Sequence, residues 1–306
     1  MSYFYGAFGF VLREIYHLVN NYGLALIIFT FIARLLMFPT SISQQKNTAK
    51  MQRMQTKVKK IQQKYAGDQR KIQEETQALY SREGTNPMGA GCLPLVIQLP
   101  IIYGLIGVIY RPLKYVLRIS DGDIATLTTA LKNVVEVTKS SERTIQLLII
   151  ENIDKLSGAV PTDIFNKIAS FDFEFLGLPL GQVPQIKHPS ALWIVPILSG
   201  LSSLASSFFM YMRQRSSDPQ AAKNPTMGCM TFGMPLFSLY FTFQFPVGIG
   251  IYWIASNLFA FLQMVILNFT HSPKKMLAKE LIEETVQRRS REENLKRVAE
   301  IKNNAR

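Results

Sequence analysis

The sequence has only two cysteines, Cys92 and Cys229, among its 306 residues. Two thiols exclude a disulfide-rich scaffold and a four-cysteine zinc site. Collagen-like and disordered classes are excluded as well, because 48% of the residues are hydrophobic and the chain has only 18 glycines and 15 prolines. Charged residues make up 18% of the chain and are confined to the segments between long apolar runs. A membrane protein is the class that remains.

Motifs that carry out catalysis or bind nucleotides are also missing. The sequence has no GxxxxGK[ST] loop, and its three histidines are far apart, with no HExxH pair. Ser43-Gln44-Gln45-Lys46 matches the bare SxxK pattern without its partner motifs. Gly200-Leu201-Ser202 invites comparison with an intramembrane serine protease, but His271 follows the last apolar run and is poorly placed as its base. The sequence therefore predicts a protein that is not an enzyme and that uses no metal or cofactor.

Five apolar runs are each long enough to cross a membrane as a helix. A span needs about 20 mostly apolar residues to cross a hydrocarbon core of roughly 30 Å. The runs are residues 22–41, 88–112, 190–212, 227–245 and 246–270. The sequence therefore predicts an all-α fold, a polytopic membrane protein with five transmembrane helices.

Residues 1–21 are expected to form an amphipathic helix on the extracellular side of the membrane. Arg13, Glu14 and His17 interrupt any continuous apolar core, so a cleavable signal is not expected. The apolar residues instead recur at steps of three and four, a pattern typical of a helix that lies on the membrane surface. They are Phe4, Phe8, Val11, Leu12, Ile15 and Val19.

The distribution of basic residues predicts the orientation of the spans. Segments 42–87, 213–226 and 271–306 hold ten, three and ten Lys or Arg, whereas segment 113–189 balances eight basic residues with nine acidic ones. Basic residues accumulate on the cytoplasmic side of membrane proteins. We therefore expect the first three segments to be cytoplasmic, segment 113–189 to be an extracellular loop or subdomain, and the N-terminus to lie outside.

Two of the cytoplasmic segments are predicted to be helical. In segment 42–87, Ala66-Gly67-Asp68 separates two helices of a hairpin, which is either a solvated linker or a docking arm beside the membrane. The basic tail 271–306 contains Arg288-Arg289-Ser290-Arg291 and either anchors the topology or contacts phosphate groups. The hairpin is predicted from the coiled-coil seam of its first helix: Met51, Met54, Val58, Ile61 and Tyr65.

Arg34 is the one charged residue in the interior of a predicted span, away from its ends. It lies roughly 10 Å inside the cytoplasmic end of its helix, and an arginine at the centre of a span costs about 2.5–3.5 kcal/mol on insertion scales. Either it snorkels to the cytoplasmic edge or it faces a water-bearing interior. Because no Asp or Glu lies inside any predicted span, its guanidinium lacks an internal counter-ion and is available to a carboxylate of another molecule.

Uncharged polar residues on the other spans are expected to form a groove around Arg34. On the fifth span they fall within an arc of roughly 140°. The third span contributes serines at four-residue steps, for which close helix packing is the alternative explanation. The predicted groove residues are Arg34, Gln98, Ser203, Tyr252, Trp253, Ser256, Asn257 and Gln263.

These residues carry a resemblance to a known family. Residues 245–257 read FPVGIGIYWIASN, which resembles the FPxGxxxYWxxSN signature of the YidC/Oxa/Alb membrane protein insertases. Residues 94–100 read PLVIQLP, similar to the second-span motif of that family, and Arg34 occupies the place of its first-span arginine. The order of spans, hairpin and tail is similar to the five-span, Gram-positive type and covers nearly the whole chain.

The resemblance implies a hydrophilic groove in the inner leaflet, in which Arg34 attracts polar parts of a nascent membrane protein before its helix enters the lipid bilayer. It also implies the plasma membrane of a bacterium, action alone or with the Sec translocon, and a tail close to the ribosome. The alternative is a transporter or channel for an anionic solute that uses Arg34 as its binding charge. Such proteins usually contain inverted repeats of broken helices, whereas the polar residues here do not recur in matching halves.

Overall fold

The computed structural model describes residues 2–84, 87–137, 139–217, 225–270 and 273–304. The chain is mostly helical and forms two compact units. The first contains Met1–Leu36 and Ile97–Leu262, and the second contains Met37–Val96 and Gln263–Arg306. Half of the predicted cytoplasmic loop 213–226 and small parts of the predicted hairpin, extracellular segment and tail lie outside the described residues.

The first unit contains a helical bundle. Its helices are α1 (Ser2–Val19), α2 (Tyr22–Leu36), the later part of α5 (Pro87–Ile109), α10 (Ile194–Ser217), α11 (Pro225–Thr242) and most of α12 (Val247–Thr270). A short 3₁₀ helix, η3 (Ala191–Trp193), leads into α10.

Two helical stretches of the described residues are long and apolar enough to cross a membrane on their own. They are Ala191–Arg213 and Val247–Thr270, which match the predicted third and fifth spans to within one residue at each end. The pair Tyr22–Leu36 and Phe38–Lys64 passes the same test only when it is taken as one broken span, and Gln98–Ile109 is apolar but shorter. The structure thus supports a helical membrane protein, whereas the total of five spans stays a prediction.

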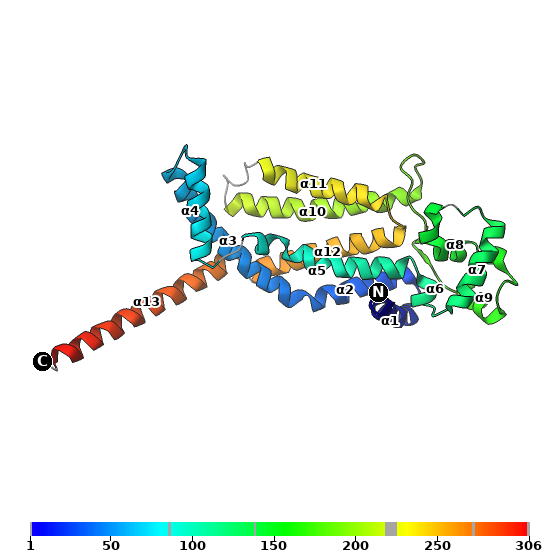
Figure 1. Cartoon of the computed structure of the whole chain (residues 1–306), viewed down its shortest axis with the longest axis horizontal. Helices are drawn as coiled ribbons and strands as arrows, with labels where there is room; N and C mark the ends of the chain where they lie inside the picture. The colour runs from blue at the N-terminus through cyan, green and yellow to red at the C-terminus, as the bar shows by residue number, and fades with distance from the viewer. Residues whose placement is uncertain (1, 85–86, 138, 218–224, 271–272, 305–306) are drawn as a thin grey trace. The chain divides into compact units, whose positions relative to one another are not determined.

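The helices α10 and α11 run side by side, and small residues bring them together (Figure 1). A Cβ atom added to Gly200 of α10 would lie 3.1 Å from the side chain of Leu239 on α11. The hydroxyls of Ser199 and Ser238 are 2.8 Å apart, and Thr242 donates a hydrogen bond of 2.9 Å to Ser199. For Ser199 the close-packing explanation therefore holds.

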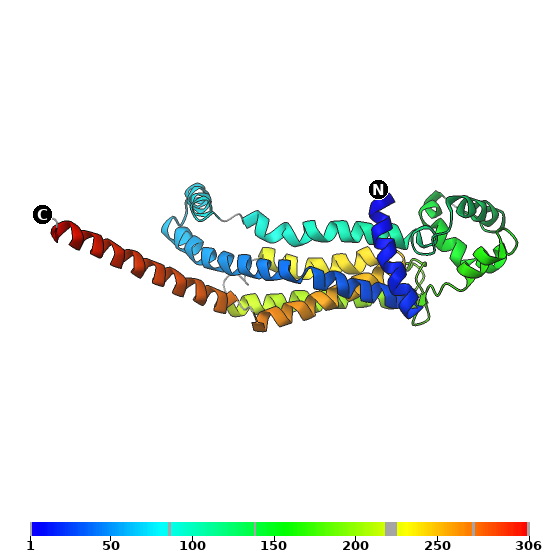
Figure 2. The ribbon, with the colours of Figure 1, turned by 90° about the horizontal axis from the view of Figure 1, so that it is seen from below.

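Helix α1 runs across α2 rather than along it (Figure 2). Leu12 and Ile15 of its predicted apolar stripe are buried in the core of the unit, and Phe8 and Val19 pack against that core. Of the six stripe residues, only Phe4 and Val11 are exposed. Much of the stripe predicted to face the membrane is therefore covered by protein.

The segment predicted to be extracellular folds into a set of short helices. They are α6 (Pro112–Tyr115), α7 (Asp121–Val134), η1 (Lys139–Thr144), α8 (Ile145–Glu151), η2 (Ile153–Leu156) and α9 (Thr162–Ala169). They are followed by an antiparallel hairpin of β1 (Glu174–Phe175) and β2 (Leu178–Pro179). This hairpin is the one departure from an all-α fold among the described residues, and strands of two residues are too short to show the alternating pattern of a strand.

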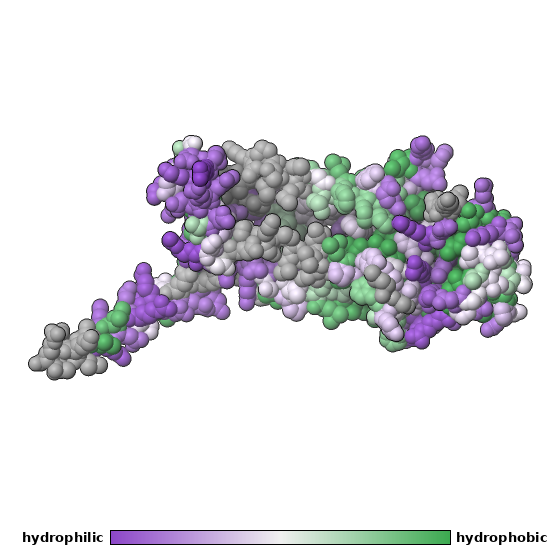
Figure 3. All heavy atoms as spheres, viewed as in Figure 1, coloured by the Kyte–Doolittle hydropathy of each residue, from purple (hydrophilic) through white to green (hydrophobic). Residues whose placement is uncertain are grey.

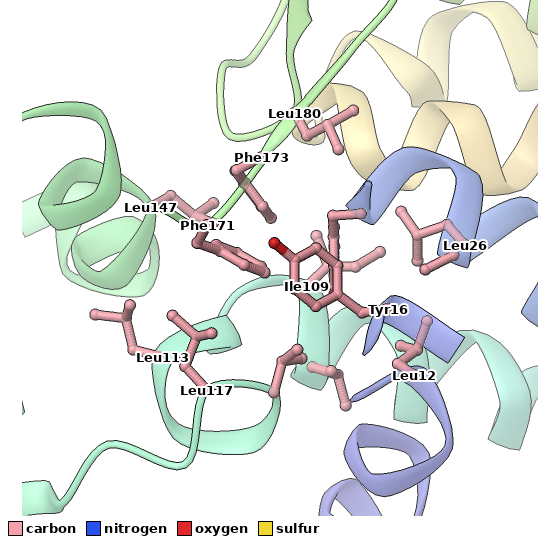
Figure 4. Close-up of a cluster of buried hydrophobic side chains, with 14 of the residues drawn as sticks. Leu12, Tyr16, Leu26, Ile109, Leu113, Leu117, Leu147, Phe171, Phe173 and Leu180 are labelled. Carbon is pink, nitrogen blue, oxygen red and sulfur yellow. The ribbon is translucent and has the colours of Figure 1, made fainter. Parts of the chain in front are cut away.

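A single apolar core joins these short helices to the bundle. Figure 4 shows side chains from α1, α2, α5, α6, α8 and the segment before β1 pointing toward one another. Because Leu26, Ile109 and Leu180 have no exposed surface, the short helices are part of the same hydrophobic core and not a separate domain.

Polar contacts fix the corner between α1 and α2 against residues 171–175. The side-chain amide of Asn21 donates to Asp172 Oδ2 at 2.7 Å and to the Glu174 carbonyl at 2.9 Å. The backbone N–H of Asp172 donates to the Tyr16 hydroxyl at 3.1 Å. These bonds hold the start of β1 at the first turn of α2.

The second unit contains α3 (Phe38–Lys64), α4 (Gln69–Arg82) and α13 (Pro273–Asn304). Helices α3 and α4 contact each other, and Lys57 forms an ion pair with Glu83. Asp68 caps α4 by accepting a hydrogen bond of 3.0 Å from the Lys71 amide. Hydrophilic side chains dominate the visible faces of α4 and α13 (Figure 3), which is typical of helices in water.

Candidate functional site

Arg34 lies in the last turn of α2 and points toward α12. Its Nη2 donates a hydrogen bond of 2.6 Å to the hydroxyl of Ser256. The side chain is half-buried. Within the part of the chain that the structure describes, no acidic side chain forms an ion pair with Arg34. A neutral hydroxyl orients this guanidinium but does not neutralise it.

Gln98 and Tyr252 form a second polar contact beside the first. The Gln98 amide on α5 donates to the Tyr252 hydroxyl at 2.5 Å. Tyr252 is buried and precedes Ser256 by four residues, so one face of α12 carries both side chains. We call Arg34, Gln98, Tyr252 and Ser256 the Arg34 cluster, because three helices bring four of the predicted groove residues together.

Asn257 is held by α10. Its side-chain amide donates to the Ser202 hydroxyl at 3.1 Å, and Ser202 donates in turn to the Ser199 carbonyl at 3.0 Å. Ser203, the predicted serine, is half-buried next to it. Adjacent residues differ by about 100° around a helix, and the four-residue repeat of serines is shared by both positions. The sequence pattern therefore indicates two rows of serines on this helix, but it does not indicate which of the two rows contacts α12.

The other two predicted residues have different surroundings. Trp253 packs against Phe241 of α11, with ring centroids 5.1 Å apart. Gln263 belongs to the second unit, where its amide donates to the Ser41 hydroxyl on α3 at 2.8 Å. Neither residue contributes a hydrogen bond to the Arg34 cluster in the described structure. Trp253 supports helix packing, and Gln263 ties the end of α12 to α3.

The Arg34 cluster combines one permanent positive charge with a hydroxyl, a phenol and an amide. A guanidinium has five N–H donors in a planar fork, which match a carboxylate well. None of the four side chains is a base able to activate a nucleophile at neutral pH. No group of three or more potential metal ligands occurs among the described residues. The arrangement is suited to binding acidic or polar groups.

Comparisons with known proteins place the chain in a family. The sequence model of the family described as 60Kd inner membrane protein matches residues 14–275. A Fusobacterium nucleatum protein named membrane protein insertase YidC is 26% identical over 267 residues, which are 86% of this chain and 96% of the relative. A Bacillus subtilis protein named membrane protein insertase MisCA is 27% identical over 248 residues, 80% of this chain and 69% of the relative.

Some relatives are much longer than the matched region. A Granulibacter bethesdensis protein, also named membrane protein insertase YidC, is 28% identical over 273 residues, which are 89% of this chain but 39% of the relative. This chain thus spans less than half of some relatives and nearly all of others. The match covers most of the chain, and the resemblance predicted from the motif at 245–257 is confirmed: the chain belongs to the 60Kd inner membrane protein family.

Proposed function

We propose that the protein is a membrane protein insertase. It binds nascent membrane proteins in a hydrophilic groove that contains the Arg34 cluster, and it transfers their helices into the lipid bilayer. It works alone or with the Sec translocon. The names of its relatives support the insertase role.

The observation that carries this proposal is the unneutralised charge of Arg34. Among the described residues it makes one hydrogen bond, to Ser256, which leaves most of its N–H donors available. A half-buried guanidinium attracts a carboxylate more strongly than one in bulk water, because the surrounding dielectric constant is lower. A polar or acidic stretch of a client chain gains from this attraction at the point where it leaves water.

The proposed topology follows the charge distribution of the sequence. Five helices cross the plasma membrane of a bacterium, with residues 113–189 outside and segments 42–87, 213–226 and 271–306 in the cytoplasm. The basic tail lies close enough to the membrane surface to meet ribosomal phosphates. In this orientation Arg34 lies in the inner leaflet, near the side from which clients arrive.

The proposal is tested by photo-crosslinking from the first span. A photoreactive amino acid is placed at position 34 and, as a matched control, at Leu35, whose side chain is 54% exposed on the same helix. With ribosome-bound nascent chains, position 34 should crosslink to the client and position 35 mainly to lipid. Equal client yields at both positions would contradict a groove at Arg34. Anion flux through proteoliposomes without a client would instead favour the transporter.

A further inference from the structure

The β1–β2 hairpin has an unusual residue at its tip. Phe175 pairs with Leu178, so the turn consists of only Leu176 and Gly177. Both have positive φ angles, 52° and 75°, as in a type I′ turn, which strongly prefers Asn-Gly. Leucine is disfavoured in this left-handed region because its Cβ crowds the backbone. The side chain of Leu176 is also 85% exposed, so packing within the protein does not compensate for the conformation.

The hairpin is fixed at the beginning of α2. Phe175 packs so closely on Gly23 that a Cβ atom at Gly23 would lie 2.4 Å from the Phe175 Cβ. The bonds from Asn21 to Asp172 and Glu174 hold the same strand in place. Because Leu176 directly follows Phe175, it lies at the same level of the bundle as the first turn of α2.

Other exposed apolar side chains lie at the corner between α1 and α2 and along α2. Leu18, at the end of α1, is 83% exposed, and Leu24, in the first turn of α2, is 39% exposed. Farther along α2, Phe31, Ile32 and Leu35 are exposed as well, as expected for a helix that faces lipid. Leu18 and Leu176 thus both leave a large apolar side chain exposed close to Asn21, whose amide binds Glu174.

We propose that Leu176 inserts into the outer leaflet of the membrane and anchors the hairpin, and with it the α1–α2 corner, at the lipid interface. This inference rests on the proposed orientation, in which the first turn of α2 lies at the outer surface. Transfer of the exposed leucine from water into lipid offsets the unfavourable turn conformation. The partner is the lipid of the outer leaflet and not a protein.

Site-directed spin labelling tests the insertion directly. In a variant in which Cys92 and Cys229 are replaced by serine, a nitroxide is attached to Leu176→Cys in nanodiscs, and its accessibility to oxygen and to a water-soluble nickel chelate is measured. Leu35→Cys is the control for lipid and Ser157→Cys, at an exposed site on a short-helix loop, is the control for water. The label at 176 should match the oxygen-accessible lipid control, with at least fivefold lower nickel accessibility than at 157.

The controls separate the possible results. A label at 176 that behaves like the one at 157 overturns the anchor and leaves the proposed topology intact, provided the label at 35 is in lipid. A label at 35 that is exposed to nickel overturns the topology itself. Low accessibility of 176 to both reagents means that protein covers the tip, which also overturns the inference.

A second measurement compares two substitutions of Leu176. Asn suits the turn but not lipid, whereas Met keeps the apolar side chain. In nanodiscs, Leu176→Asn should increase amide hydrogen exchange of residues 174–178 by about fivefold or more, and Leu176→Met should leave it unchanged. Slower exchange in the Asn variant than in the unmodified protein would show that turn geometry alone governs this hairpin, against the proposed anchor.

Discussion

Replacement of Arg34 tests the proposed mechanism most directly. Arg34→Ala removes the charge from the Arg34 cluster, Arg34→Lys keeps it without the planar fork, and Arg34→Glu reverses it. If the role of Arg34 is to attract client charge, Lys should retain much of the activity. Ala should impair clients with acidic translocated segments, and Glu should impair them most.

The size of the effect follows from the surroundings of the guanidinium. Two unit charges 4 Å apart attract by about 1 kcal/mol in bulk water and about 4 kcal/mol at an effective dielectric constant of 20. Arg34 is half-buried, so an intermediate value of about 2 kcal/mol is reasonable. Since about 1.4 kcal/mol corresponds to a factor of ten, Arg34→Ala should reduce the capture of a client by roughly 30-fold for an acidic residue that reaches the site.

The assay uses a series of clients that differ only in the number of acidic residues in the translocated segment. Insertion into reconstituted vesicles is measured by protease protection, at equal amounts of folded insertase. Ser256→Ala is the matched control, because it removes the hydrogen-bond partner of Arg34 but leaves the charge. This control should lower insertion only slightly and without dependence on client charge.

A loss that is equal for all clients would refute the reasoning. Arg34 would then serve the fold or the hydration of the groove and not the attraction of client charge. The same conclusion would follow if Ser256→Ala and Arg34→Ala had identical effects across the series.

Three further predictions concern stability and partners. Gly250→Ala should destabilise the bundle by about 1–3 kcal/mol, because its Cβ would lie 2.4 Å from Val195. Gly233→Ala should not lower the thermal unfolding temperature in detergent, because in the described part of the chain no atom outside its own helix turn would lie within 4 Å of the new Cβ. Tyr22→Phe should leave that temperature unchanged or raise it, because the buried hydroxyl has no hydrogen-bond partner among the described residues; a clear decrease would contradict this reasoning. Truncation after about residue 272 should weaken ribosome co-sedimentation in a salt-dependent way, and binding that does not change with salt would exclude phosphate contact.

Much of the helical organisation could be predicted from composition and periodicity. Long apolar runs locate helices reliably because the bilayer sets their length. The sequence does not predict the break near Met37: α2 ends at Leu36 and α3 begins at Phe38, both inside the apolar run 22–41. Pro39, in the first turn of α3, suits the beginning of a new helix, and this signal lay within the apolar run.

The candidate site was predictable in part. An intramembrane arginine stands out because of its cost, and the polar arc of α12 indicated Tyr252 and Ser256 as its neighbours. Which side chains meet depends on the rotation of each helix, which the sequence does not determine. This is why Asn257 binds Ser202 and not Ser203, and why Trp253 packs on α11.

The position of α1 has a consequence for the order of assembly during synthesis. Tyr5 packs on Gly107 and on Tyr115, and Tyr16 packs on Phe171, with ring centroids 4.9 Å apart. Helix α1 can pack on α2 early, but Phe171, the partner of Tyr16, is made 155 residues after Tyr16 itself. Until then its apolar face needs another covering, which the membrane surface can supply. Helix α1 therefore completes its packing only after the segment that ends in β1 has been made.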